Sequence, residues 1–230
     1  MKKSDFLKII EGHLIVSCQA RLGWPMYGEK IMAAFAEAAK LGGAVAIRAN
    51  GASNIREIKN KVDLPVLGIN KIWIEKESVY ITPTFDSAVE IIEAGVEAIA
   101  LDGTRRKRPN NEKLEDIICK IKTKYPEMII MGDCATVEDA LYSEKCGVDI
   151  VSTTLYGYTE ETKGNSEINY DLIKDISSKV KIPLIAEGHV NTGEVAKKCI
   201  ENGALSVVVG TAITRPEIIT KNFVEEINKI

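Results

Sequence analysis

The sequence predicts an α/β protein that folds as one closed (β/α)8 barrel, a TIM barrel, over residues 1–230. Three observations lead to this class. The length of 230 residues is near the usual span of such a barrel. Eight short apolar runs alternate with segments of helical periodicity. Glycine and proline punctuate the chain with a period of two strand–helix units.

The eight apolar runs have the length and the β-branched content of buried parallel strands. They cover residues 14–18, 44–47, 66–69, 98–101, 128–131, 149–152, 183–186 and 206–209. Helical spacing of apolar residues is clearest at 31–40 and continues at 86–93, 111–124, 137–146, 170–179, 192–201 and 217–229, with a shorter and weaker segment at 54–61. Residues 79–84 are expected to add a short strand on the loop that follows the third strand.

Turn residues mark the even and odd strands differently. Each even strand follows a glycine that closes the preceding helix, as a left-handed cap does: Gly43, Gly95, Gly147 and Gly203, at intervals of 52, 52 and 56 residues. Three odd strands are entered through a proline, which a strand tolerates at its first position: Pro65, Pro126 and Pro183. This period favours a closed barrel, although an open doubly wound sheet would share much of it. No linker or low-complexity tract divides the chain, so a single domain is expected.

The composition argues against several kinds of partner. With 45% hydrophobic and 27% charged residues and a net charge of −3, the chain has no bulk attraction for nucleic acid. Residues 1–11 resemble a signal peptide only briefly, because Asp5, Lys8 and Glu11 interrupt the apolar stretch, and no later run reaches membrane-spanning length. The five cysteines are scattered and contain no C-x-x-C pair, which indicates a reducing cytoplasm.

Polar and ionisable residues gather where the strands are expected to end. In a barrel of this class the carboxyl ends of the strands form the mouth that holds the active site. The residues at these ends are Gln19, Arg48, Lys71, Asp102, Asp133 and Glu187. Any one of them could belong to an ion pair of the rim, but their coincidence on one rim favours a functional site.

Lys71 and Glu187 follow the third and seventh strands, on opposite sides of a ring of eight. A substrate bound over the barrel axis would lie between them. Burial beside Arg48 would disfavour the charged form of Lys71 and leave a neutral amine. Such an amine could be a base or a Schiff-base nucleophile, and the alternative is a lysine that faces solvent or pairs with phosphate.

A phosphate site is expected after the last two strands. Residues 184–188 and 206–212 contain short β-branched runs that end in glycine, as in the phosphate sites that many such barrels build there. Gly188, Gly210 and Thr211 would offer backbone N–H donors, and Arg215 would add a charged fork. Glycine after a strand is also common turn chemistry, but two tandem cases near an arginine are less common. The substrate is therefore expected to carry a phosphate.

Three other motifs receive less weight. The basic run at residues 105–109 matches a nucleic-acid patch, but its place after the fourth strand suits the steering of an anionic metabolite better. His189 beside Glu187 suggests a metal centre. The chain has only two histidines, however, and no H-x-H or H-E-x-x-H spacing, which argues against a metal. Cys18 and Cys134 are expected to be small core residues.

Eight motifs run through the chain from end to end: LIVSCQ at 14–19, AIRA at 46–49, GINK at 68–71, YITP at 80–83, ALDGT at 100–104, STTLYGYT at 152–159, AEG at 186–188 and GTAITR at 210–215. On these motifs the chain resembles the bacterial N-acetylmannosamine-6-phosphate 2-epimerases. The resemblance implies a (β/α)8 barrel and an isomerase of amino-sugar and sialic acid catabolism that needs no cofactor or metal. It also implies a site made of the catalytic lysine Lys71, the substrate-holding and lysine-orienting residues Arg48, Asp133 and Glu187, and Gln19. Two positions depart from the family pattern: His189 replaces an arginine, which bears on phosphate binding, and Ile72 replaces a basic residue.

The implied reaction inverts C2 of N-acetylmannosamine 6-phosphate and gives N-acetylglucosamine 6-phosphate. The C2 proton is acidic only in the open-chain aldehyde, where its removal gives an enolate on the C1 oxygen. We expect Lys71 to abstract this proton, Glu187 to position Lys71 or to serve the opposite face, and Arg48 to stabilise the enolate oxygen. The choice between one base and two stays open.

Two rival functions remain, a Schiff-base aldolase that uses the same lysine and a barrel that only senses a sugar phosphate. The expected partner is a small-molecule sugar phosphate, with no nucleic acid or membrane partner, and the protein is expected to be a cytoplasmic homodimer.

Overall fold

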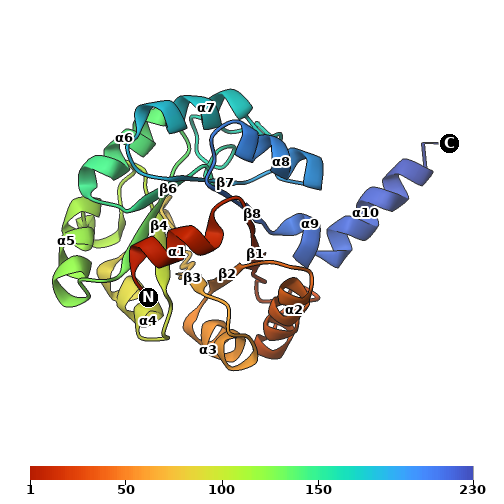
Figure 1. Ribbon diagram of the computed structural model, residues 1–230, viewed down its shortest axis with the longest axis horizontal. Coiled ribbons are helices and arrows are strands. Elements are labelled where there is room, and N and C mark those ends of the chain that lie inside the picture. The colour runs from red at the N-terminus through yellow and green to blue at the C-terminus, as the bar shows by residue number, and fades with distance from the viewer. Residues whose placement is uncertain (230) are drawn as a thin grey trace.

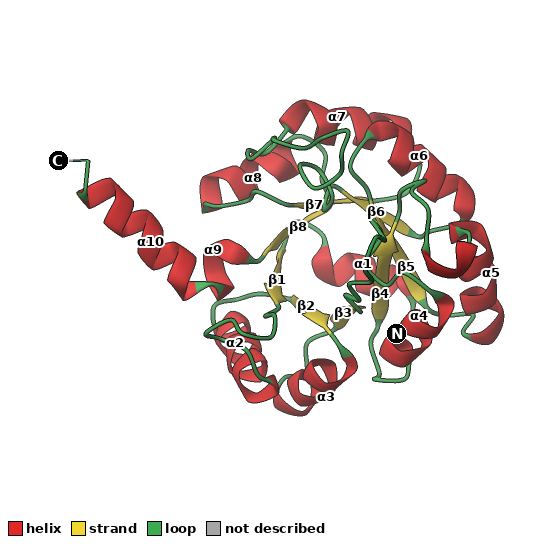
Figure 2. Ribbon diagram, turned by 180° about the vertical axis from the view of Figure 1, so that it is seen from behind, coloured by secondary structure: helices red, strands yellow, loops and turns green. Residues whose placement is uncertain are grey.

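The computed structural model describes residues 1–229 and contains eight parallel strands closed into a barrel, with helices around it (Figure 1; Figure 2). The strands pair in sequence order, and β8 returns to pair with β1. Their bounds are β1 Leu14–Cys18, β2 Ala46–Asn50, β3 Val66–Ile69, β4 Ala98–Asp102, β5 Ile129–Asp133, β6 Ile150–Ser152, β7 Leu184–Glu187 and β8 Ser206–Val209. The predicted (β/α)8 barrel is confirmed. The assignment of residues 1–230 to a single domain stays a prediction, and residue 230 lies outside the described residues.

Four strands, β2, β4, β5 and β7, extend further towards their carboxyl ends than the apolar runs predicted. Their polar last residues keep the backbone pairing of a strand: Asn50 pairs with Ile69, and Asp133 pairs with Ser152. A polar side chain that points into the barrel mouth does not interrupt the backbone ladder. The apolar pattern therefore ends too early where polar residues of the barrel mouth begin.

The helices are α1 Lys3–Ile10, α2 Glu29–Leu41, α3 Ala52–Lys61, α4 Phe85–Ile92, α5 Leu114–Lys124, α6 Val137–Cys146, α7 Tyr170–Lys179, α8 Gly193–Glu201, α9 Thr211–Thr214 and α10 Pro216–Ile227, with a 3-10 turn η1 at Pro109–Asn111. The four capping glycines have φ between 94° and 104°, as the sequence predicted. The predicted start of a helix at residue 111 is wrong, because Asn110 and Asn111 have φ of 58° and 55° and α5 begins at Leu114. Helices α1 and α9 were not predicted.

Helix α1 closes one end of the barrel, and Figure 1 shows it across the middle of the ring. Phe6 and Ile10 are fully buried and join the apolar cluster that fills the barrel interior with Ile15, Leu67 and Met131. A larger cluster lies between the strands and the outer helices. Because α1 precedes β1, it plugs the end where the strands begin.

Residues 79–84 do not form the predicted strand. They make one isolated antiparallel bridge, between Lys71 and Ile81, on the loop between β3 and α4 where the extra segment was expected. The neighbouring backbone bonds run from Ile72 N–H to the Tyr80 carbonyl at 2.9 Å and from Thr82 N–H to the Asn70 carbonyl at 2.8 Å. This loop therefore folds back on the segment that carries Lys71.

Helix α10 projects away from the barrel (Figure 1; Figure 2). None of its residues is buried, and its exposed apolar side chains include Phe223, Val224 and Ile227. Within residues 1–229, no helix combines the length and apolar character that crossing a membrane requires.

Candidate active site

A cavity of about 770 Å³ lies at the carboxyl ends of the strands. Seven of the nine predicted site residues line it: Gln19, Lys71, Glu187, Gly188, Gly210, Thr211 and Arg215. The other two, Arg48 and Asp133, are 0% exposed and lie beneath the cavity. The structure therefore brings the nine residues into one region, seven at the cavity surface and two under it.

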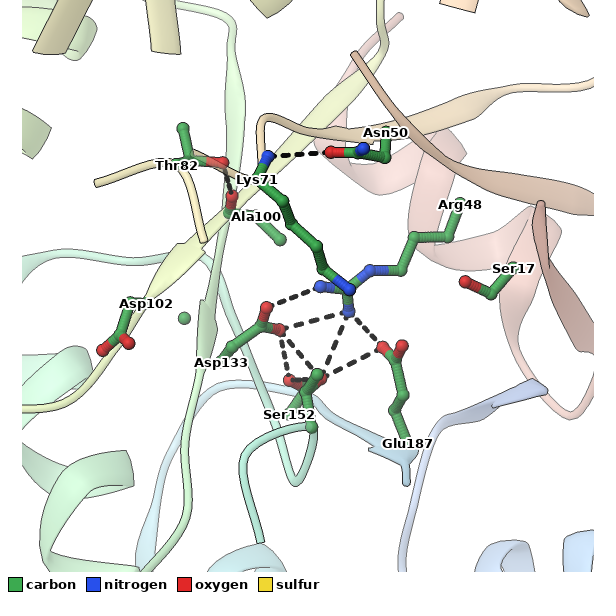
Figure 3. Close-up of polar contacts among 12 residues, drawn as sticks. Ser17, Arg48, Asn50, Lys71, Thr82, Ala100, Asp102, Asp133, Ser152 and Glu187 are labelled. Carbon is green, nitrogen blue, oxygen red and sulfur yellow. Dashed lines mark hydrogen bonds and ion pairs between the residues drawn. The ribbon is translucent and has the colours of Figure 1, made fainter. Parts of the chain in front are cut away.

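A buried ion cluster forms the floor of this cavity (Figure 3). The Arg48 guanidinium donates to both Asp133 oxygens, from Nη2 to Oδ2 at 2.5 Å and from Nη1 to Oδ1 at 3.2 Å, and it also pairs with Glu187. Ser152 donates to Asp133 Oδ1 at 2.8 Å. Thr154 Oγ1 lies 2.9 Å from Asp133 Oδ1 and 3.0 Å from Glu187 Oε2. These contacts hold both carboxylates around one cation.

The strands fix the three charged side chains of this cluster. Arg48 lies on β2, Asp133 ends β5 and Glu187 ends β7, so the cluster joins strands from across the barrel. The hydroxyls of Ser152 and Thr154 were not predicted as part of the site. Ser152 ends the sixth apolar run and Thr154 follows it closely, and both belong to the motif at 152–159, but short hydroxyl side chains at such a place are also ordinary loop chemistry.

Lys71 lies two residues beyond the end of β3, and its side chain extends towards the Arg48 guanidinium (Figure 3). Burial and, after it, the positive charge of Arg48 lower the pKa of Lys71 to about 8, although Glu187 and Asp133 oppose the shift. The direction is the one expected from a lysine buried beside an arginine. A substantial fraction of Lys71 is therefore a neutral amine near pH 8.

Glu187 and Arg48 respond to the same burial in opposite ways. Burial raises the pKa of Glu187, and the nearby Asp133 carboxylate raises it too, although Arg48 and Lys71 oppose the shift. Burial alone would lower the pKa of Arg48, but its ion pairs with Asp133 and Glu187 raise it above the ordinary value. The cluster thus contains one permanent cation and two groups, Lys71 and Glu187, whose pKa values move towards each other.

The end of the cavity at β7 and β8 is built from glycine and arginine. Gly188 has a φ of 97°, which favours glycine. A Cβ at Gly210 would lie 3.3 Å from the Ser17 Cβ, so the chain passes close to β1 at this point. The Arg215 guanidinium stacks over the Trp24 ring at 3.7 Å and donates a hydrogen bond to Glu217 at 2.7 Å.

Gln19, which follows β1, also faces the cavity. Its side-chain amide donates to the Ser17 hydroxyl at 2.6 Å, while its Oε1 is buried with no partner within residues 1–229.

Aromatic residues that were not predicted also line the cavity, among them Trp24 and Tyr80. The Arg21 guanidinium lies 5.4 Å from the centre of the Trp24 ring and 4.6 Å from that of Trp73. The rings of Trp73 and Tyr80 stack with centroids 5.8 Å apart. These contacts connect the loops after β1 and β3. No spacing in the sequence linked these residues, because the contacts arise only when the two loops meet.

The lower-weight motifs have internal partners. Arg106 pairs with Asp102 at 2.5 Å, and Arg108 is 2% exposed and donates to the Asp102 carbonyl, so only Arg105 and Lys107 of the basic run are exposed. His189 Nε2 lies 3.1 Å from the Tyr156 carbonyl, and its ring stacks on Tyr158. The thiols of Cys18 and Cys134 are buried, as expected. Across residues 1–229, no group of three His, Cys, Asp or Glu side chains is placed to hold a metal.

The barrel and its cavity define a class, a (β/α)8 barrel enzyme with a titratable amine above an ion cluster that contains a titratable carboxyl. Comparison with known proteins gives the family. Residues 32–229 match the family model described as "Putative N-acetylmannosamine-6-phosphate epimerase". The chain belongs to this family, as the resemblance implied, and by that membership it is an isomerase of the epimerase type.

Individual relatives cover nearly the whole chain. A "Putative N-acetylmannosamine-6-phosphate 2-epimerase" of Caldanaerobacter subterraneus is 46% identical over 220 residues, which cover 96% of this chain and 93% of that protein. A protein of the same description from Listeria monocytogenes is 45% identical over 229 residues, which cover 99% and 97%. The solved structure of the N-acetylmannosamine-6-phosphate 2-epimerase from Clostridium perfringens has a TM-score of 0.92 and 44% identity, covering 96% of this chain and 95% of that chain.

Proposed function

We propose that this protein inverts C2 of N-acetylmannosamine 6-phosphate to give N-acetylglucosamine 6-phosphate, with Lys71 and Glu187 carrying the proton. The names of the relatives supply the substrate. The cavity of about 770 Å³ has a size suited to a small-molecule ligand. One observation carries the proposal: a lysine with a pKa of about 8 shares a buried cluster with a carboxyl whose pKa is raised.

The charge of the cluster leaves one mobile proton. With Arg48 counted as positive and Asp133 and Glu187 as negative, the cluster carries one excess negative charge. A proton on either Lys71 or Glu187 balances it. In the form with a neutral amine and a protonated carboxyl, Lys71 can accept a proton and Glu187 can donate one. Both groups that an epimerisation needs are then ready at the same time.

The proton steps follow from this form. Lys71 Nζ takes the C2 proton of the open-chain aldehyde, and the C2–H electron pair moves to give an enolate on the C1 oxygen. Glu187 then gives its proton to C2 on the opposite face, and the enolate returns to the aldehyde. A proton passes from the Lys71 ammonium to the Glu187 carboxylate and restores the starting form. The positions of β3 and β7, opposite each other in the closed order of strands, support the use of two faces.

Arg48 and Asp133 take supporting roles in this proposal. Both are fully buried, so the predicted contact of Arg48 with the enolate oxygen changes to an electrostatic effect from below the cavity. The Arg48 charge favours negative charge on the substrate and lowers the pKa of Lys71. Asp133 holds the guanidinium in place through two hydrogen bonds.

The phosphate is proposed to bind at the β7 and β8 end. Gly188, Gly210, Thr211 and Arg215 line the cavity there, on the two loops that many barrels use for phosphate. Glycines at this position let an anion approach the backbone N–H groups, and Arg215 adds a positive charge. Gln19, whose Oε1 is buried without a partner in the described chain, is proposed to accept a hydrogen bond from the sugar.

The assembly is proposed to be a cytoplasmic homodimer that docks through α10. This helix projects from the barrel with Phe223 68% and Ile227 64% exposed, and its residues Ile218, Ile219 and Phe223 also reach the cavity. Sedimentation should show a dimer that Ile227→Glu weakens, with Lys229→Glu as the control on the same end of the chain. A monomeric wild-type protein would contradict the dimer.

Incubation with N-acetylmannosamine 6-phosphate in deuterated water, followed by NMR at C2, tests the function. We expect interconversion of the two epimers with one deuterium entering at C2. Binding without exchange would instead indicate a sensor. A borohydride-trapped adduct on Lys71 would indicate Schiff-base chemistry.

A further inference from the structure

Lys71 lies beyond the end of its strand, outside the regular backbone pairing of the barrel. Strand β3 ends at Ile69, and its partner β2 ends at Asn50, which pairs with Ile69. At Gly51 the chain turns with a φ of 84° and enters α3, and the Gly51 carbonyl accepts the Ile55 N–H at 3.1 Å. The ladder therefore offers no further backbone acceptor to Lys71.

A side chain replaces the missing backbone acceptor. The Lys71 N–H donates to Asn50 Oδ1 at 2.7 Å, a bond visible in Figure 3. The backbone of Asn50 is held by its pairing with Ile69 on β3, and its carbonyl also accepts from Asn54 Nδ2 at 2.8 Å. A buried backbone N–H needs such a partner. The amide of Asn50 thus extends the β2 to β3 pairing by one residue.

The opposite side of Lys71 is held by Thr82. The Thr82 N–H donates to the Asn70 carbonyl at 2.8 Å, and the Asn70 N–H donates back to Thr82 Oγ1 at 3.0 Å. Thr82 Oγ1 also donates to the Ala100 carbonyl on β4 at 2.7 Å. Thr82 has a φ of 44°, a conformation unusual for a β-branched residue, and strained positions of this kind cluster at functional sites.

We propose that Asn50 is a positioning residue for Lys71: its amide oxygen fixes the Lys71 backbone beyond the end of β3 and so directs the amine at the buried cluster. This inference rests on the proposed role of Lys71 in the epimerisation. A lysine side chain has four rotatable bonds, so the position of its Cα decides whether Nζ can reach the substrate carbon. A misplacement of about 1 Å can lower a rate by about 100-fold.

The test compares three variants in two measurements. Asn50→Leu removes the acceptor at nearly constant size, Asn50→Asp keeps the acceptor, and Asn54→Ala removes a hydrogen bond of the same turn that does not touch Lys71. The first measurement is kcat and KM for N-acetylmannosamine 6-phosphate. The second is the pH midpoint of Lys71 acetylation, obtained by competitive labelling and mass spectrometry without substrate.

In Asn50→Leu we expect kcat to fall about tenfold to 100-fold with KM within about twofold. The labelling midpoint should rise from near pH 8 towards the ordinary value of 10.5, as the amine leaves its buried position. Asn50→Asp should keep kcat within about threefold of wild type, and Asn54→Ala should change neither measurement, because neither variant removes the acceptor of Lys71.

The proposal is overturned if Asn50→Leu keeps both kcat and the labelling midpoint, or if Asn54→Ala changes them as much. Should Asn50→Leu not fold, Asn50→Ala takes its place, and an unchanged kcat and labelling midpoint in that variant would overturn the proposal. A wild-type protein without C2 exchange would refute the epimerase function, while the labelling midpoint of the variants would still decide the role of Asn50.

Discussion

The ion cluster under the cavity and the lysine above it are held in different ways. Arg48, Asp133 and Glu187 lie within strands of a closed barrel and satisfy one another through direct ion pairs. Lys71 lies beyond its strand and depends on one side-chain amide and one loop. The buried charges of Arg48 and Asp133 give a constant field, whereas Lys71, one of the two groups proposed to carry the proton, stands beyond the end of its strand. We therefore expect a substitution in the ion cluster to lower the free energy of unfolding, and a substitution of Lys71 to lower the rate of C2 exchange.

Lys71→Met tests the catalytic role of the lysine and gives the largest expected effect. C2 exchange should fall about 100-fold to 10,000-fold, because general-base assistance is lost. The free energy of unfolding should stay the same or rise, since an apolar side chain replaces a partly buried amine. NMR exchange and urea denaturation measure the two quantities. Exchange at the wild-type rate would refute the role of Lys71.

Arg48→Met tests how much the buried ion cluster stabilises the barrel. It leaves Asp133 and Glu187 without their shared cation, which should lower the free energy of unfolding by about 3–5 kcal/mol. Lys61→Met is the matched control, since it removes an exposed pair with Glu37 that contributes about 0–1 kcal/mol. Urea denaturation compares the two variants. Equal losses would show that the buried cluster does not stabilise the barrel in this way.

Arg215→Gln tests a third region, the proposed phosphate-binding end of the cavity. We expect KM to rise about tenfold with kcat within about threefold, because a uniform binding contact is lost. Competition by inorganic phosphate should weaken to the same extent. Lys221→Gln, which removes an exposed charge from α10, serves as the control. An unchanged KM would place the phosphate elsewhere in the cavity.

The pH dependence of stability gives the smallest expected effect. The pKa of Lys71 is about 8 in the folded protein and 10.5 ordinarily, so between these values the unfolded chain binds more protons. The free energy of unfolding contributed by Lys71 therefore rises with pH across this window and is lost as pH falls through 8. The difference between wild type and Lys71→Met, measured by urea denaturation from pH 7 to about 10, isolates this slope. A flat difference would mean that the folded pKa is not lowered.

Much of the fold could be predicted from the sequence, because a buried parallel strand and a glycine-capped helix leave strong local patterns. The ends of β2 and β5 could not, since Asn50 and Asp133 are polar residues in regular strand pairing. Helix α1 was missed because Phe6 and Ile10 pack into the barrel interior, a contact that no local spacing reveals.

The residues of the site, like the elements of the fold, were predicted only in part. Lys71 and Glu187 could be selected because they follow apolar runs that end at the barrel mouth. The contacts that complete the site join residues far apart in the chain, as when Thr154 approaches Asp133 and Asn50 holds Lys71. Such pairings depend on the register of the closed barrel. The sequence therefore indicated which residues meet at the mouth, but not which of them support the others.

The most direct test of the central claim compares two pH profiles of the wild-type protein. One is the rate of deuterium exchange at C2 of N-acetylmannosamine 6-phosphate, and the other is the acetylation of Lys71 without substrate. We expect the free-enzyme rate constant to fall with rising pH at the same midpoint, near 8, at which the labelling of Lys71 rises, because the one proton that Lys71 and Glu187 share is lost there. Exchange that stays constant or rises while Lys71 loses its charge would contradict Lys71 and Glu187 as a base and an acid that share one proton.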